Sequence, residues 1–157
     1  MSNNDIQQQT TVNIQEKANL IWAIADKLVG VYKPHEYGNV ILPMCVIKRF
    51  EDTLTPTKEK VLATNEKLDK DGIVVKKGFL ESAAEQKFYN LSPFDFQKLL
   101  NDPENIKVNF ESYLNHFSDN VIDIIHRMDF DREIEKMADN GVLYLVIKEF
   151  CTPKAYL

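Results

Sequence analysis

Apolar residues recur every three or four positions along this 157-residue chain, in short blocks that proline or glycine closes. This feature constrains the fold most, because such spacing places apolar side chains on one face of an α-helix. The clearest block ends at Gly30, and its apolar residues are Ile14, Ala18, Ile21, Ala25 and Leu28. The chain is therefore expected to be all-α, a multi-helix bundle of about eight helices with at most a small β hairpin.

The start of this first block divides the chain. Asn13 and Glu16 have the spacing of a capping box, which marks a helix start. Residues 1–12 are mostly polar and lack the apolar stretch of a signal peptide. We expect residues 1–12 to be a flexible polar leader and residues 13–157 to be a helical domain.

Two segments leave alternatives open. Pro43 lies in an apolar block from Val40 to Leu54, where it either begins the helix or kinks it, because proline donates no backbone N–H. The run from Val142 to Phe150 suits a strand by its residues and a last helix by its position. Any β structure is expected there or between Gly72 and Gly78.

The helical stripes also predict the hydrophobic core. Large apolar and aromatic side chains on such stripes are usually buried. The residues expected in the core are Ile21, Trp22, Leu28, Ile47, Phe50, Phe110, Phe117, Ile124 and Leu145.

Charge is unevenly distributed along the chain. The formal net charge is −5, which argues against a surface that binds polyanions throughout. Residues 27–87 carry 11 basic and 9 acidic side chains, whereas residues 88–157 carry 7 basic and 12 acidic ones. A polyanion therefore finds a favourable local field only in the first half. No apolar run approaches the length needed to span a bilayer, so a cytoplasmic protein without a membrane contact is expected.

Catalytic motifs are missing from the sequence. The five glycines are not spaced for a phosphate-binding loop, and His35, His116 and His126 form no zinc-binding pair. Cys45 lies on an apolar stripe, which is typical of a buried thiol. The acidic residues from Asp129 to Glu135 surround a helix start, where negative charge is favourable. We predict no catalytic, cofactor-binding or metal-binding residue.

Several short strings resemble one known family. They run in order along nearly the whole chain, from Leu20 to Phe150. The strings are residues 20–26 (LIWAIAD), 36–43 (EYGNVILP), 48–50 (KRF), 54–58 (LTPTK), 88–90 (FYN), 98–106 (KLLNDPENI) and 143–146 (LYLV). Together they resemble the start of the modification subunit, the methyltransferase, of type I restriction–modification systems.

The resemblance implies a helical domain that precedes a catalytic domain. In that family the catalytic domain binds S-adenosylmethionine and methylates adenine in DNA, and its marks are a glycine-rich loop and an Asn-Pro-Pro-aromatic motif. Neither mark occurs here, because no two prolines are adjacent and no glycine pair has the loop spacing. The chain is interpreted as the amino-terminal domain alone, an enzyme's domain without the enzyme's active site.

The resemblance also implies partners. They are DNA, a specificity subunit, a second modification subunit and a restriction subunit, with the helical domains closing around the DNA. Lysine and arginine suffice for such sequence-independent contact. The candidate DNA-contact residues are Lys48, Arg49, Lys58 and Lys60, the most concentrated basic group in the first half. Alternatives are a stand-alone helical interaction module and a small unaided enzyme.

Overall fold

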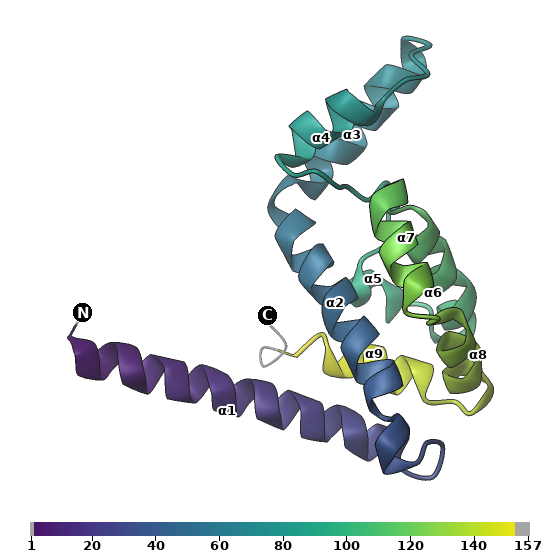
Figure 1. Cartoon of the computed structure of the whole chain (residues 1–157). Helices are drawn as coiled ribbons and strands as arrows, with labels where there is room; N and C mark the ends of the chain where they lie inside the picture. The colour runs from purple at the N-terminus through teal and green to yellow at the C-terminus, as the bar shows by residue number, and fades with distance from the viewer. Residues whose placement is uncertain (1, 153–157) are drawn as a thin grey trace.

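The computed structural model describes residues 2–152 and is all-α, as predicted (Figure 1). These residues contain nine α-helices, of which α5 is a single turn, and no strand. Isolated β-bridges join Val29 to Tyr32 and Asn90 to Phe117. The α-helices are α1 (Asn3–Leu28), α2 (Gly38–Leu54), α3 (Lys58–Lys70), α4 (Lys77–Ala84), α5 (Phe96–Leu99), α6 (Ile106–Asn115), α7 (Asp119–Arg127), α8 (Asp131–Asp139) and α9 (Leu143–Glu149). The 3-10 helices are η1 (Pro34–Glu36), η2 (Thr55–Thr57) and η3 (Pro103–Asn105).

The helices form a central body with two projections (Figure 1). In the body, α2 lies beside the later helices α5 to α9, and α6 packs against α8 and α9. The carboxyl-terminal part of α1 contacts α9 and α2, while the amino-terminal part extends away from them. At the opposite end, α3 and α4 pair as a hairpin that also projects.

The first helix begins earlier than predicted. It starts at Asn3, because Ser2 and Asp5 form a capping box: the Asp5 N–H donates to Ser2 Oγ, and the Ser2 N–H donates to the Asp5 carboxylate. The predicted start at Asn13 is therefore wrong, and residues 3–12 are helical, with exposed side chains. The predicted stop is confirmed, since the helix ends at Leu28 and Gly30 has a φ of +86°.

The structure also decides both open segments. Pro43 lies in the second turn of α2, which begins at Gly38, so the helix does not begin at the proline. Residues 143–149 are helical, as the position of this run favoured. Its side chains Val146 and Ile147 are buried in the bundle.

The core is confirmed for part of the predicted set. Leu28, Ile47, Phe110 and Phe117 are buried, and Phe50 is partly buried, with its ring centroid 5.1 Å from that of Phe88. Four predicted core residues are wrong because they are exposed: Ile21, Trp22, Ile124 and Leu145. Each is close in sequence to a residue that is buried instead, such as Leu20, Ile125 or Val146. The apolar faces of these helices are therefore wider than the strip that the bundle covers.

Phe96 on α5 joins the later helices through its ring. Its centroid lies 6.0 Å from that of Phe110, 6.1 Å from Tyr113 and 6.1 Å from Phe150, all in edge-to-face geometry. Such pairs add stabilisation beyond the apolar area that they bury.

Among residues 2–152, none of the helices combines the length and apolar character needed to cross a membrane.

Candidate functional site

A cavity of about 180 Å³ opens where the end of α2, the start of α3, the segment after α4 and helix α6 meet. Three of the strings that carry the family resemblance meet here, since they contribute Lys58, Asn90 and Lys98. The lining residues are Glu51, Leu54, Thr55, Lys58, Glu59, Asn90, Asp95, Lys98 and Tyr113.

Lys58 is the half-buried cation of this cavity. Its Nζ donates a hydrogen bond to Asn90 Oδ1 at 2.9 Å and lies 5.8 Å from the centroid of the Tyr113 ring. Burial lowers the pKa of Lys58 to about 8, although Glu51 and Asp95 act in the opposite direction. The Lys58 ammonium therefore links helix α3 to Asn90 inside the fold.

Asn90 connects Lys58 to α6. The Asn90 side chain is buried, its Nδ2 donates to the Tyr113 carbonyl oxygen at 3.0 Å, and its Oδ1 accepts from the Ser92 N–H at 2.7 Å. Next to it, the Leu91 N–H donates to the His116 carbonyl oxygen at 2.9 Å. The bonds to the Tyr113 and His116 carbonyl oxygens hold the segment after α4 against α6. With its Oδ1 and Nδ2 already bonded, the Asn90 amide has little capacity left for a ligand.

Glu51 forms the opposite wall with buried partners. Its Oε1 accepts from the Phe96 N–H at 2.8 Å, its Oε2 lies 3.4 Å from Lys48 Nζ, and the Tyr113 hydroxyl donates to the same carboxylate. The pKa of Glu51 is raised above its ordinary value, because the effect of burial is larger than the opposing effect of the Lys48 charge. Lys48 also pairs with Asp52 at 3.1 Å and lies over the Phe96 ring. The cavity is thus walled by a connected polar network.

Comparison with known proteins assigns the chain to a family. A family model described as the HsdM N-terminal domain matches residues 17–150. The chain belongs to this family. It therefore derives from the modification subunit of a type I restriction–modification system, as the resemblance indicated. No curated protein and no solved structure matches the chain significantly.

The four candidate DNA-contact residues of this HsdM N-terminal domain occupy two different environments. Lys48 and Lys58 are held inside the fold by Glu51, Asp52 and Asn90. Arg49 and Lys60 are exposed, and within residues 2–152 their side chains form no ion pair. Only Arg49 and Lys60 are thus presented to a macromolecular partner without first breaking an internal contact.

Sequence reasoning did not single out Glu51, Asn90 or Tyr113 as members of a site. A local signal existed for Glu51, which lies three residues after Lys48 on a helix. Asn90 was part of a family string, but its bond to Lys58 joins positions 32 apart, and no periodicity shows such a contact.

Metal-binding groups, the two cysteine thiols and the ion pairs near α8 were considered as other candidate sites. Among residues 2–152, no group of three histidine, cysteine or carboxylate side chains is placed to hold a metal ion. Burial raises the pKa of both Cys45 and Cys151, the latter to about 11, which keeps each thiol protonated and a weak nucleophile at neutral pH. Near the start of α8, Arg132 pairs with Asp129 at 3.2 Å and with Glu133 at 3.6 Å.

Proposed function

We propose that this chain is the amino-terminal domain of an adenine-specific DNA methyltransferase subunit and contributes to subunit assembly and to closing on DNA. The single observation that carries the proposal is the family match over residues 17–150. Binding of S-adenosylmethionine and methyl transfer belong to a separate catalytic domain of the parent subunit. The partners are DNA, the specificity subunit, a second modification subunit and the restriction subunit.

The DNA contact is proposed on the exposed side chains Arg49 and Lys60. A phosphate contact needs a cation that DNA can reach and that is not already paired with a carboxylate. Both side chains are exposed and form no ion pair among residues 2–152. Lys58 contributes less directly, since Glu51 and Asp95 surround it with negative charge. With a net charge of −5, the isolated domain binds duplex DNA weakly, and tethering in the assembled complex makes the contact effective.

The experiment reverses both exposed charges in the full-length modification subunit, as R49E/K60E. If both side chains contact phosphates, the slope of log affinity against log salt decreases in magnitude by about 1.8, together with a loss of DNA affinity at low salt. The matched control is R127E/K148E, which makes the same change in net charge on α7 and α9. Equal effects of the two variants would contradict a contact at Arg49 and Lys60.

A further inference from the structure

Lys58 differs in its partners from Lys48, which is also half-buried. Lys48 Nζ lies between two carboxylates, 3.4 Å from that of Glu51 and 3.1 Å from that of Asp52. Lys58 Nζ instead donates to a neutral amide oxygen, Asn90 Oδ1, and lies over an aromatic ring. Within residues 2–152 Lys58 forms no ion pair, so no carboxylate in direct contact holds its nitrogen in the charged form.

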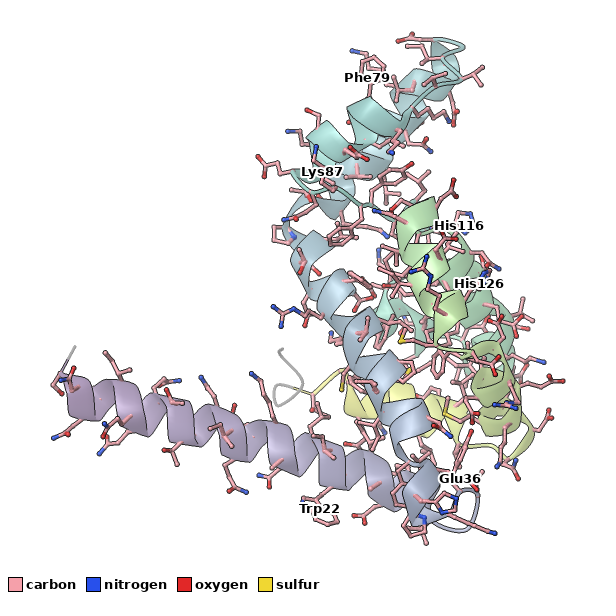
Figure 2. The ribbon with its side chains drawn as sticks, viewed as in Figure 1. Trp22, Glu36, Phe79, Lys87, His116 and His126 are labelled. Carbon is pink, nitrogen blue, oxygen red and sulfur yellow. The ribbon has the colours of Figure 1, made fainter. Side chains whose placement is uncertain are left out.

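The cavity gives Lys58 open space. Its volume is about 180 Å³, whereas a buried water needs about 10–15 Å³, so the three non-hydrogen atoms of an acetyl group fit beside Lys58. An acylated nitrogen keeps one N–H, which suffices for the bond to Asn90 Oδ1. In Figure 2, Lys87 marks the segment after α4 that carries Asn90. His116 marks the end of α6, three residues after Tyr113.

Charged and titratable groups from several helices line the cavity with Lys58. They are Glu51 on α2, Glu59 on α3, Asp95 and Lys98 at α5, and Tyr113 on α6. Burial has the largest effect and lowers the pKa of Lys58 to about 8, while Glu51 and Asp95 act against it and Lys98 acts with it. A lysine that is partly neutral near neutral pH is an activated nucleophile.

We propose that Lys58 is an acylation site that takes a short acyl group from an acyl thioester. The neutral nitrogen attacks the thioester carbonyl carbon, an N–C bond forms and the C–S bond breaks. The sulfur leaves with the electron pair and takes up the proton that the nitrogen loses, so the products are an amide and a free thiol. An acyl phosphate is a poorer donor, because it is anionic and the carboxylates of Glu51, Glu59 and Asp95 line the cavity. The reaction needs no other subunit and is independent of the proposed DNA contact.

The test follows acetylation of the 157-residue chain by acetyl-coenzyme A, with mass spectrometry of peptides to measure each lysine. At pH 7.5 the neutral fraction of Lys58 is about 200-fold larger than that of a lysine with the reference pKa of about 10.4. The lower basicity removes roughly tenfold of this gain, by analogy with thiols, and partial burial removes another part. We expect Lys58 to react at least about fivefold faster than the exposed Lys60 and than the ion-paired Lys48. With acetyl phosphate we expect a smaller preference for Lys58.

The dependence on pH and on a neighbouring charge gives a second readout. The rate at Lys58 is expected to rise to about pH 9 and then level off, because the nitrogen is then neutral. K98E replaces a cation that lowers the pKa of Lys58 by an anion that raises it, so the rate at pH 7.5 is expected to fall at least about twofold. The matched control K67E makes the same change in charge near the other end of α3 and is expected to leave the rate unchanged.

A chain with acetyl-lysine incorporated at position 58 tests whether the cavity holds the acyl group. The amide is uncharged, so it avoids the cost of a half-buried ammonium. The melting temperature at pH 7 is therefore expected to equal or exceed that of the unmodified chain.

Four results would overturn the inference. Acetylation of Lys58 no faster than that of Lys60 would show that its nitrogen is not activated. A rate that keeps rising beyond pH 10 would show that Lys58 is an ordinary ammonium. A clearly lower melting temperature of the chain with acetyl-lysine at position 58 would show that the cavity does not accept the group. An equal preference for Lys58 with acetyl phosphate would refute the thioester as the favoured donor.

Discussion

Replacing Lys58 by methionine tests the cavity network, because methionine keeps much of the side-chain length and removes the charge. In the folded chain the pKa of Lys58 is lowered from 10.5 to about 8, mainly by burial. The charged form of Lys58 therefore costs stability. This cost is fully present below pH 8 and is lost as the pH rises from about 8 to 10.5, since the unfolded chain then binds more protons than the folded one.

The size of the effect follows from the shift. One pKa unit corresponds to about 1.4 kcal/mol, so the full shift corresponds to about 3 kcal/mol. Part of the Lys58 side chain faces solvent, which weakens the effect, and only part of the titration lies between pH 7 and pH 9. We expect the unfolding free energy of the original chain to rise relative to that of Lys58→Met by about 1 kcal/mol between these pH values.

Urea denaturation followed by circular dichroism at pH 7 and pH 9 measures this difference, and subtracting the variant cancels all other titrating groups. Lys60→Met is the matched control on the same helix, because its side chain is exposed. If the difference for Lys58→Met were constant, or fell as the pH rose, Lys58 would not be the desolvated cation of the cavity.

Two further predictions concern the core and the cofactor. Phe110→Ala is expected to cost about 3–5 kcal/mol, because the ring is fully buried against Phe96 and Tyr113, whereas Trp22→Ala is expected to cost about 0.5 kcal/mol or less. Denaturation curves of both variants check this contrast, and equal losses would contradict the burial of one ring and the exposure of the other. The chain alone is expected not to bind S-adenosylmethionine, and stoichiometric binding at micromolar concentration in calorimetric titration would refute that expectation.

Local signals explain which parts of the fold the sequence could predict. The stop at Gly30 depends on a backbone conformation that glycine adopts easily, and Gly30 has a positive φ. The start of α1 was misjudged because two capping signals compete, and the one at Ser2 operates. Such signals act over a few residues, so they are visible without a structure.

Tertiary packing decides what the sequence could not show. Helix α1 has two adjacent apolar strips, and contact with α9 and α2 buries the one that contains Leu20 and Ile24, leaving Ile21 exposed. Periodicity alone does not distinguish such strips. In the same way, Lys48 and Lys58 follow a pattern typical of a solvated surface, and only the fold brings Glu51 and Asn90 to them.

The most direct test of the central claim compares the full-length modification subunit with a variant that lacks residues 17–150, the span of the family match. Both are combined with the specificity subunit, and methyl transfer to duplex DNA is measured together with binding of S-adenosylmethionine. The proposed function predicts that the shortened subunit still binds S-adenosylmethionine but loses assembly, DNA affinity and methyl transfer. A shortened subunit that assembles and methylates DNA as well as the full-length one would contradict it.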